Sequence, residues 1–309
     1  MTITAKIIAH SVAPNGQQIV TFELQYPRFI LAEFNTHRIF SRNSASSRAI
    51  PVKTIIDQVR NNPAMPIHFG ANQPGMQASV ELTGIKRQQA VNVWEFAADR
   101  AAESAEILAD QGVHKQVANR ILEPFQTMKT VMTATCMDNF FWLRNHEDAQ
   151  PEIKELARLM WGALQASTPN ELKPGEWHTP YFGNGYWRDT YAGFGFDGMS
   201  LEEALAISSS CCAQVSYRKL DDTLEKAQMV YKRLVESEPV HASPFEHQAT
   251  PMQDEVDSKR VQINSTHPYT WELGITHRDR YDSLWSGNFI GWVQFRQTIP
   301  NNVCHKYEP

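Results

Sequence analysis

The chain has 309 residues, 42% of them apolar and 20% charged, which is typical of soluble globular proteins and enough for one large domain or two ordinary ones. Its formal charge of −5 at pH 7 argues against general coating of nucleic acid, which needs a basic face, although one local basic pocket stays compatible. The sequence shows neither the apolar region of a signal peptide nor a run long enough to span a membrane. We therefore expect a cytoplasmic protein with no membrane partner and no direct nucleic-acid partner.

The first predicted elements are a strand and a helix that lead into a polar loop. Residues 17–26 alternate apolar and polar side chains, which predicts a strand with one buried face. Pro27 suits the first turn of a helix, and residues 28–38 continue that helix. Residues 60–80 hold several prolines and glycines and are expected to be irregular.

Longer helices are predicted in the middle of the chain. Residues 88–111 place apolar side chains at steps of three and four, with Gly112 as the stop signal. Asp138 is the expected N-cap of a short helix with the sequence DNFFWLRNH, and Pro151 opens another helix with one apolar face.

The second half begins with an aromatic stretch. Residues 168–199 are rich in Trp, Tyr, Pro and Gly and are expected to form a long ordered loop. Ser200 and Glu203 fit a capping box for a helix over 201–208, and residues 221–237 fit an amphipathic helix. Because strands are few and helices long, the predicted class is α+β, with a small, mostly antiparallel sheet packed with long helices.

Cysteine usage indicates a reducing compartment. The cysteines are Cys136, Cys211, Cys212 and Cys304, and no two form a C-x-x-C pair. Zinc sites commonly need such pairs, so no metal site is expected. Buried thiols are the favoured interpretation for the adjacent pair and for Cys136, because free cysteine is often buried.

Residues 35–51, NTHRIFSRNSASSRAIP, are the densest concentration of anion donors in the chain. Arg38, Arg42 and Arg48 fall within eleven residues and would repel one another unless water or an anion lies among them. Serine hydroxyls and turn amides add neutral donors. Composition alone leaves two interpretations open, a solvated surface loop and a phosphate site.

The segment HASPFEH is a second candidate site. It places His241 and His247 on either side of Glu246, as a metal or acid–base cluster would. Its spacing is not the H-E-x-x-H of zinc proteases. The alternative is a turn in which Ser243 and Pro244 begin a helix.

Two further arginines lie among apolar residues. Arg120 and Arg144 are each either salt-bridged in the core or directed into a ligand site, and the structural interpretation is favoured for either one alone. The chain has neither G-x-x-x-x-G-K-[ST] nor G-x-G-x-x-G, so side chains must hold any nucleotide.

Together these segments resemble the flavin-dependent thymidylate synthases, the thymidylate-synthase-complementing proteins. Their signature is close to R-H-R-x-x-S-x-N-x-x-S-x-R, and THRIFSRNSASSR matches it at His37, Arg38, Ser41, Asn43, Ser46 and Arg48. A second family segment, N-F-x-x-L-R-x-x-x-x-A-Q-x-E-I, follows an arginine and a proline. It is similar to NFFWLRNHEDAQPEI, which follows Arg120 and Pro124.

The resemblance also implies a rearranged order of segments. The family begins with A-R-V-S-[FY], a helix and H-E-[ST]-P-F-E-H, whereas CAQVSY, a helix and HASPFEH lie here in the C-terminal half. We expect one domain over 1–309, in which 1–167 matches the family's C-terminal part, 200–309 its N-terminal part, and 168–199 is an inserted loop. Circular permutation is tolerable when termini lie close together. Partial duplication is the alternative, because the closing GNFIGWVQFRQTIPNN faintly resembles the helix and signature; residues 251–290 stay unexplained.

The resemblance implies roles for individual side chains. Those expected at the nucleotide are Glu33, Ser44, Ser46, Arg48, Arg120 and Arg144. Those expected at FAD are Thr36, His37, Arg38, Asn139, Ser216 and Ser243. The catalytic candidates are Arg144, which would face the uracil ring and favour a deprotonated ring nitrogen, and His241, near flavin and folate. Ser46 and Arg48 would hold the phosphate, and Arg42 has no counterpart and is expected to be solvated.

Three positions depart from the family pattern. Thr36 replaces the first signature arginine, Ser44 stands at a usual glutamate, and Glu33 stands at a usual glutamine near the nucleotide. A carboxylate can accept from an exocyclic amino group, as on cytosine. A dCMP substrate, or a hydroxymethyl product, is therefore an alternative, and so is a non-catalytic nucleotide-binding protein.

The resemblance implies an FAD-dependent methyltransferase of the thymidylate synthase type. Methylenetetrahydrofolate would donate a one-carbon unit to C5 of a pyrimidine deoxynucleotide monophosphate, most simply dUMP giving dTMP. Reduced FAD would give the hydride, and NADPH would reduce the flavin. Such chemistry needs no protein nucleophile, because the cofactor performs the difficult step. A homotetramer is expected, and a metal-dependent hydrolase using His241, Glu246 and His247 is the competing enzyme hypothesis.

Overall fold

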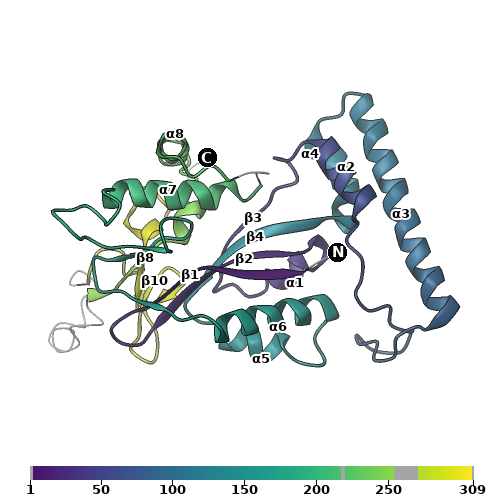
Figure 1. Ribbon diagram of the computed structural model, residues 1–309, viewed down its shortest axis with the longest axis horizontal. Helices are drawn as coiled ribbons and strands as arrows, with labels where there is room; N and C mark the ends of the chain where they lie inside the picture. Colours follow the sequence, from purple (N-terminus) through teal and green to yellow (C-terminus); the bar gives the residue numbers. More distant parts are fainter. Residues whose placement is uncertain (1–2, 217–219, 254–270, 308–309) are drawn as a thin grey trace.

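A five-stranded sheet forms the centre of the computed structural model, which describes residues 3–216, 220–253 and 271–307 (Figure 1). Its strand order is β3-β4-β2-β1-β5, and every neighbouring pair is antiparallel except the parallel pair β1–β5. The strands are β1 (Thr4–Val12), β2 (Gln18–Pro27), β3 (Ser41–Ser44), β4 (Thr127–Ala134) and β5 (Asn170–Glu171).

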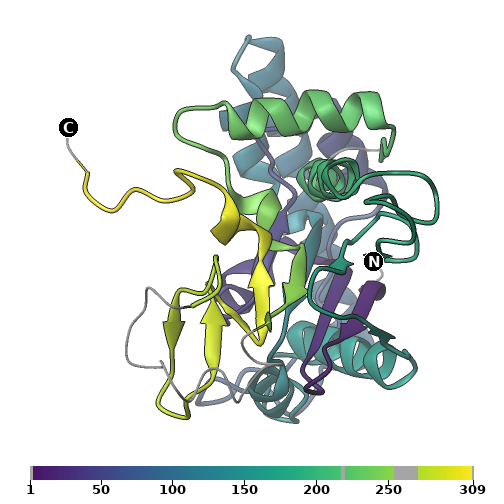
Figure 2. The ribbon, with the colours of Figure 1, turned by 90° about the vertical axis from the view of Figure 1, so that its left-hand side faces the viewer.

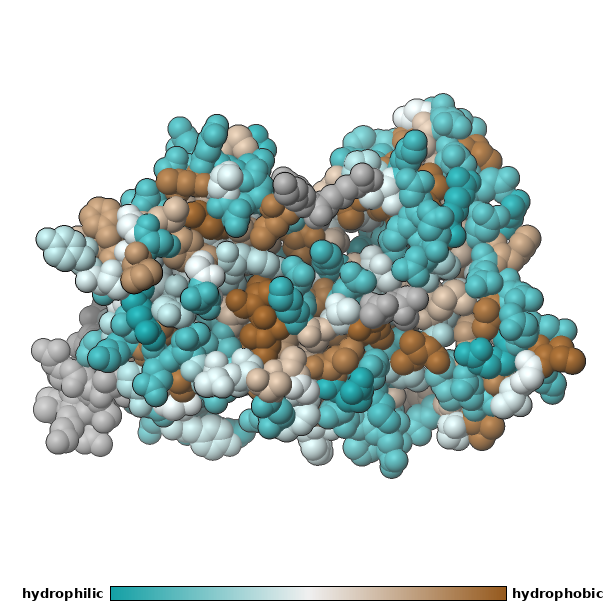
Figure 3. Space-filling view, viewed as in Figure 1, coloured by the Kyte–Doolittle hydropathy of each residue, from teal (hydrophilic) through white to brown (hydrophobic). Residues whose placement is uncertain are grey.

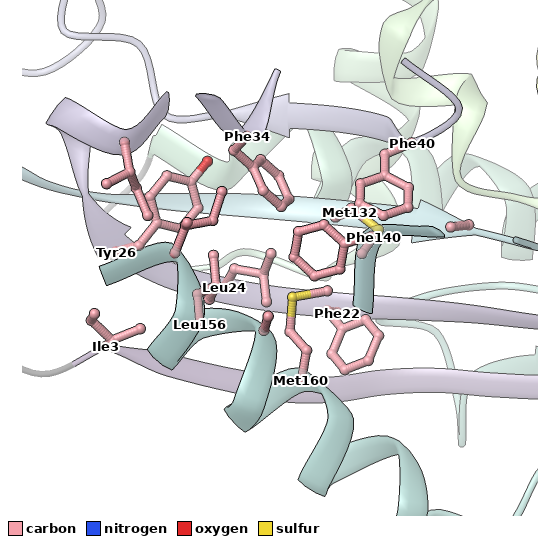
Figure 4. Close-up of a cluster of buried hydrophobic side chains, with 14 of the residues drawn as sticks. Ile3, Phe22, Leu24, Tyr26, Phe34, Phe40, Met132, Phe140, Leu156 and Met160 are labelled. Carbon is pink, nitrogen blue, oxygen red and sulfur yellow. The ribbon is translucent and has the colours of Figure 1, made fainter. Parts of the chain in front are cut away.

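The main core lies between this sheet and two helices, α5 (Asp138–Arg144) and α6 (Pro151–Gln165). Figure 4 shows aromatic and aliphatic side chains of the sheet meeting those of the helices. Alternate residues of β2 bury Val20, Phe22, Leu24 and Tyr26 on this face, which confirms the predicted strand. Burying each such side chain contributes roughly 1.5–3 kcal/mol, so the sheet is held firmly against α5 and α6.

The prediction of only one buried face for this strand was wrong. Ile19 and Thr21, on the opposite face of β2, are both fully buried. Ile19 packs against Trp292, and the Thr21 hydroxyl lies 2.8 Å from His178 Nε2. Both partners belong to one smaller sheet that the local sequence of β2 does not reveal.

Two smaller sheets cover that second face (Figure 2). One has the order β12-β8-β6-β7 and the other β11-β10-β9. Their strands are β6 (Trp177–His178), β7 (Tyr186–Trp187), β8 (Ala249–Pro251), β9 (His277–Arg278), β10 (Leu284–Ser286), β11 (Phe289–Ile290) and β12 (Trp292–Gln294). Helices α7 (Leu201–Ala213) and α8 (Leu224–Val235) pack with the 3-10 helices η4 (Ser243–Glu246) and η6 (Phe295–Thr298) above them.

A helical arm extends from the other end of the central sheet (Figure 1). It contains α2 (Val52–Asn61), α3 (Gly84–Asp110), α4 (Lys115–Ala118) and the 3-10 helix η2 (Asn119–Phe125). Alanines on α3 allow α2 to approach closely, and Ala98, Ala102 and Ala105 are buried there. Figure 3 shows a hollow between this arm and the α7–α8 lobe. No described helix is long and apolar enough to cross a membrane.

The predicted helices occur at the expected places in the chain, but some of their end residues and caps differ from the prediction. The capping box of Ser200 and Glu203 is confirmed, although α7 continues beyond residue 208 to Ala213. The helix expected over 28–38 is shorter, because a 3-10 turn, η1 (Arg28–Ile30), precedes α1 (Leu31–Phe34). Asp138 was wrongly predicted as an N-cap.

Asp138 is the first residue of α5, and the cap residue Met137 makes no side-chain hydrogen bond. The carboxylate of Asp138 instead lies in the first helical turn, where its negative charge interacts favourably with the positive end of the helix dipole. Residues 60–80 are mostly irregular, as expected, and 168–199 form an ordered stretch that contains β5, β6 and β7.

A row of buried hydroxyl and imidazole groups connects the central sheet to the smaller sheets. The Ser11 hydroxyl lies 2.9 Å from His178 Nδ1, and Thr21 lies between His178 Nε2 at 2.8 Å and Thr133 at 2.7 Å. Thr133 in turn lies 2.9 Å from His247 Nδ1. Burial lowers the pKa of both histidines to about 3, so both rings are neutral at pH 7.

Candidate active site

The loop that follows α1 spreads its functional side chains along the edge of the central sheet. Strand β3 pairs with β4 from Ser41 opposite Thr133 to Ser44 opposite Thr130. The amide of Ala45 continues the ladder to the Lys129 carbonyl at 2.8 Å. An extended chain rises about 3.3 Å per residue, so residues 41 and 45 lie roughly 13 Å apart. The two ends of the loop therefore form two separate groups of side chains.

The first group surrounds Arg144, and we call it the Arg144 cluster: Glu33, Thr36, His37 and Arg144. The guanidinium of Arg144 forms an ion pair with Glu33, and its Nε donates to His37 Nε2 at 3.0 Å. NH2 lies 3.4 Å from the Thr36 hydroxyl. Helix α5 thus brings its last residue against α1, although more than a hundred residues separate them in sequence.

His37 has a defined protonation state in this arrangement. Burial, followed by the positive charges of Arg144 and Arg42, lowers its pKa to about 4, so the ring is neutral at pH 7. An arginine Nε can only donate, so His37 Nε2 must accept and the ring proton lies on Nδ1. Phe140 contacts the imidazole edge-on with ring centroids 4.9 Å apart. No described residue accepts a hydrogen bond from the Nδ1–H, which leaves it available as a donor.

The second group lies at the far end of the loop around Glu123, and we call it the Glu123 cluster: Arg28, Ser47, Asn119, Arg120 and Glu123. The carboxylate of Glu123 accepts from the Ser47 hydroxyl at 2.9 Å and from Arg120 at 2.8 Å, and it pairs with Arg28 at 3.1 Å. The Asn119 amide donates to the Ser47 carbonyl at 2.6 Å. These bonds fix the backbone between Ser46 and Arg48.

Arg48 itself is exposed, and no hydrogen bond or ion pair joins its guanidinium to another described residue. Ser46 beside it is half-buried. The structure therefore brings three predicted nucleotide-binding residues, Ser46, Arg48 and Arg120, to one end of the loop. Ser44 lies between the two groups, with its hydroxyl 2.9 Å from that of Thr130.

A pocket of about 330 Å³ lies between the loop and the C-terminal segment, and we call it the Arg296 pocket. Its lining includes Arg38, Arg42, Glu246 and Arg296, with Gly287, Asn288, Gln294 and Gln297 on the C-terminal side. The expectation that Arg42 is solvated was wrong. Its NH1 donates to the carbonyls of Phe34 at 3.1 Å and His37 at 3.2 Å, in and just after the end of α1.

The segment HASPFEH lies against the loop that carries the family signature, residues 36–48, which we call the signature loop. The contact is made by η4, which packs on β3. Its candidate metal ligands have other partners: Glu246 forms an ion pair with Arg296, and His247 bonds to Thr133. His241 is exposed, and Ser243 begins η4 as the alternative interpretation predicted. Within the described ranges, no group of three or more His, Cys, Asp or Glu side chains could hold a metal.

The remaining predicted cofactor residues lie on two different elements. Asn139 is exposed in the first turn of α5. Ser216 ends the 3-10 helix η3 (Gln214–Ser216), whose backbone lies against β3 and β4. Cys211 and Cys212 are buried free thiols, as predicted, and burial raises the pKa of both.

A broad groove of about 1210 Å³ opens on the other side of Arg144. Glu33 and Arg144 line one part of it, and Trp94, Trp142 and Leu143 add apolar surface. Trp142 is 74% exposed, although it follows two buried phenylalanines in α5. The groove therefore joins a charged pair to an exposed apolar surface.

Sequence reasoning missed the side chains that complete the Arg296 pocket. Asn288, Gln294 and Arg296 belong to the closing segment, which folds as β11, β12 and η6. The only signal was the clustering of Gln294, Arg296 and Gln297 among apolar residues, which did not show that they face the signature loop.

Comparison with known families adds to this geometry. A model of the family described as thymidylate synthase complementing protein matches residues 10–170, just over half of the chain. The match includes both the Arg144 and Glu123 clusters and excludes the HASPFEH segment and the closing segment.

Individual relatives are distant. The flavin-dependent thymidylate synthase of Aquifex aeolicus (strain VF5) is 26% identical over 140 residues, covering 44% of this chain and 42% of that protein. The chain thus matches less than half the length of this relative. Crystal structures of the UMP/dUMP methylase PolB from Streptomyces cacaoi, bound with 5-Br dUMP or 5-Br UMP, show 18% identity and a TM-score of 0.45. They cover 53% of this chain and 90% or 89% of the PolB chain.

Proposed function

Because this chain belongs to the thymidylate synthase complementing protein family, we propose that it transfers a one-carbon unit to C5 of a pyrimidine deoxynucleotide, converting dUMP to dTMP in a flavin-dependent reaction. The observation that carries this proposal is the Arg144 cluster. Two sequence motifs more than a hundred residues apart meet there, so that Arg144 lies against Glu33 and His37. A solvated loop would not need this convergence.

In the proposed site, Arg144 faces the base. Its guanidinium is oriented by Glu33 on NH1 and by His37 on Nε, which leaves the rest of the planar fork for a ligand. A fixed cation beside the pyrimidine stabilises negative charge that develops on the ring and so increases the nucleophilicity of C5. Neutral His37 keeps Arg144 in place and presents Nδ1–H as a further donor.

The flavin side fits an anionic flavin nucleotide. Arg38 and Arg42 line the same pocket, and Glu246 is the one carboxylate among its described lining residues. When bound, FAD would supply the hydride, methylenetetrahydrofolate the one-carbon unit and NADPH the electrons that reduce the flavin. The protein residues bind, orient and hold protons around that chemistry.

The phosphate would bind at the Glu123 cluster. Exposed Arg48 and Arg120 provide guanidinium donors there, and Ser46 lies beside them. Because the extended residues 41–45, roughly 13 Å long, lie between the two ends of the loop, one chain holds its phosphate donors and its base donors in separate groups. We therefore propose a homo-oligomer in which each site combines the two ends of the loop from different chains. Exposed Trp142 and Leu143 provide apolar surface for such contacts.

A cytosine nucleotide is the second candidate substrate, and the specific observation in its favour is Glu33. Its carboxylate lies beside Arg144, so the pair offers both an acceptor and a donor to a base edge. Cytosine presents an amino donor and a ring acceptor, which complement such a pair. The same pair can also bind uracil, through N3–H and a carbonyl, so turnover of the two nucleotides has to be compared directly.

We also propose that the segment order is rearranged relative to the family. Supporting this, η4 of HASPFEH packs on β3 of the signature, and the Thr133–His247 bond joins it to β4. The two segments are therefore spatial neighbours, although about two hundred residues separate them in sequence.

The test begins with the visible absorption spectrum of the purified protein, with and without added FAD. Bound oxidised flavin is expected to give bands near those of free FAD. A protein that is colourless after incubation with FAD and removal of the unbound FAD would support the non-catalytic alternative. Turnover is then compared between dUMP and dCMP, each with methylenetetrahydrofolate and NADPH. Product analysis distinguishes methyl from hydroxymethyl transfer.

The variant Glu33→Gln separates the two bases. Replacing the carboxylate by an amide retains one acceptor and adds a donor, which removes the preference for an amino group. If wild type uses dCMP, the variant should lose dCMP turnover more than dUMP turnover. Exclusive use of dUMP by wild type would eliminate the cytosine proposal.

A further inference from the structure

The Arg296 pocket is formed jointly by the signature loop and by a segment outside the family match. Arg38 and Arg42 come from the loop, whereas Arg296 follows β12 near the C-terminus, beyond residues 10–170. The pocket therefore contains side chains that neither the signature nor the family match assigns.

The charges in this pocket do not balance. Three guanidinium groups line it, and Glu246 is the single carboxylate among those of its lining residues that the structure describes. Arg296 pairs with Glu246 through NH1 and donates through NH2 to the Asn302 carbonyl at 3.0 Å, while its buried Nε has no partner in the described parts of the chain. Arg38 forms no ion pair with another described residue. Anions are therefore favoured in the pocket.

The wall that carries Arg296 is held rigidly against the loop. Asn288 Nδ2 donates to the Ile39 carbonyl at 2.9 Å, and Gln294 Nε2 donates to Ser41 Oγ at 3.2 Å and to Asn288 Oδ1 at 2.9 Å. Gly287 has a φ of +60°, and a Cβ there would lie 2.7 Å from Gln294 Oε1. The left-handed backbone of this turn thus favours glycine, which also lets the Gln294 side chain approach closely.

We propose that the Arg296 pocket binds a phosphate group, and that Arg296, together with Arg38, provides the cations that hold it. The ligand is assigned as the phosphate portion of a flavin nucleotide, an assignment that rests on the proposed function. Planar guanidinium forks bind phosphate oxygens bidentately, and the polar amides of Asn288 and Gln294 add neutral groups beside them. A pocket of about 330 Å³ can hold a phosphate ester.

The ion pair between Arg296 and Glu246 makes the proposal testable, because substitutions of its two members should change ligand affinity in opposite directions. If Arg296 binds phosphate, Arg296→Ala weakens binding, whereas Glu246→Gln releases the guanidinium and removes a repelling charge, so binding tightens. If Arg296 only supports the structure through its ion pair, both substitutions weaken binding. Arg278→Ala is the matched control, because Arg278 lies in the same C-terminal region, pairs with Asp282 and is outside the pocket.

The experiment measures dissociation constants of FAD and riboflavin for the full chain and these variants by flavin fluorescence. Arg296→Ala should weaken FAD binding about tenfold or more and leave riboflavin, which lacks phosphate, nearly unchanged. Arg278→Ala should change neither. Equal weakening by Arg296→Ala and Glu246→Gln, or equal effects on FAD and riboflavin, would overturn the proposal.

A second experiment, which measures the melting temperature with and without pyrophosphate, distinguishes failure of this proposal from failure of the proposed function. If wild type binds no flavin, the proposed function fails, and the pocket is then judged by pyrophosphate alone. A pyrophosphate-induced rise in melting temperature that Arg296→Ala abolishes and Arg278→Ala retains supports the phosphate site. No rise in wild type refutes it.

Discussion

The two ends of the signature loop differ in how many of their charged and polar side chains are paired within the protein. At the early end, Arg144, Glu33 and His37 bind one another, and aromatic rings surround the imidazole. At the late end, the backbone is fixed by Asn119 and Glu123, but the Arg48 guanidinium is exposed and has no partner among the described residues. The early end is organised before a ligand arrives, whereas the late end offers a free charge.

This difference shows that one motif can both stabilise the local structure, at its early end, and offer an unpaired charge to a ligand, at its late end. Substitutions that disturb the early end should lower both stability and activity, because a partly buried network loses its partners. Substitutions at the late end should lower ligand affinity alone. The following predictions test that contrast, from the largest expected effect to the smallest.

Phe140→Ala should be the most damaging change. Phe140 is 2% exposed and packs against Phe34, Phe40 and His37 beneath the early end of the loop. Its truncation should lower the free energy of unfolding by about 3–5 kcal/mol, because a cavity opens in the core. Denaturant titration measures this change. The same substitution at Phe196, which is 99% exposed, should change the value by less than about 0.5 kcal/mol.

Arg48→Ala should give the opposite profile. Loss of a charge-assisted bond to phosphate should weaken deoxynucleotide monophosphate binding roughly 10- to 100-fold, while the melting temperature stays at the wild-type value. Isothermal titration with dUMP measures the affinity. Arg100→Ala, an exposed arginine on α3, removes the same charge at a distance and should leave affinity unaltered. Unchanged affinity in Arg48→Ala would count against the phosphate assignment.

Acidification should reveal the buried histidines. His178 and His247 have folded-state pKa values of about 3, below the 6.5 of an unfolded chain. Below pH 6.5 the unfolded state binds more protons, so their contribution is fully present above pH 6.5 and is lost as pH falls toward 3. Each histidine contributes a slope of up to about 1.4 kcal/mol per pH unit in that window.

His247→Gln should reduce that slope, and chemical denaturation between pH 4 and 7 measures it. The glutamine amide cannot titrate, so up to about 1.4 kcal/mol per pH unit should disappear. His241→Gln, at an exposed position, should keep the wild-type slope. Identical slopes in His247→Gln and wild type would show that His247 is not held neutral by burial.

The parts of the fold that the sequence predicted are those with a strong local pattern. Helix α6 begins at Pro151 and buries Ile153, Leu156 and Met160 on one face, because the spacing of those residues allows only one such face. The motifs likewise indicated Arg144 as a site residue, and the structure places it at a groove. Local periodicity and motif spacing carry this information directly.

The parts that escaped prediction depend on distant contacts. Arg42 is half-buried because the carbonyls of Phe34 and His37 accept its hydrogen bonds. Arg296 lines the pocket because Asn288 and Gln294 hold its segment against the loop. The buried second face of β2 depends on Trp292, far along the chain. None of these contacts leaves a periodic trace in the sequence around the residue concerned.

The row of hydroxyl and imidazole groups has one more consequence, which concerns the direction of its protons. His247 Nε2 is buried and has no hydrogen-bond partner among the described residues. A proton on that nitrogen would be an orphaned donor, which is rarer in proteins than an orphaned acceptor. The His247 proton therefore belongs on Nδ1, donating to Thr133, which then donates to Thr21, and Thr21 to His178 Nε2. The unpaired Nε2 of His247 thus determines the tautomer of His178 on β6 through the two threonine hydroxyls. Nitrogen-15 chemical shifts should show both histidine rings protonated at Nδ1.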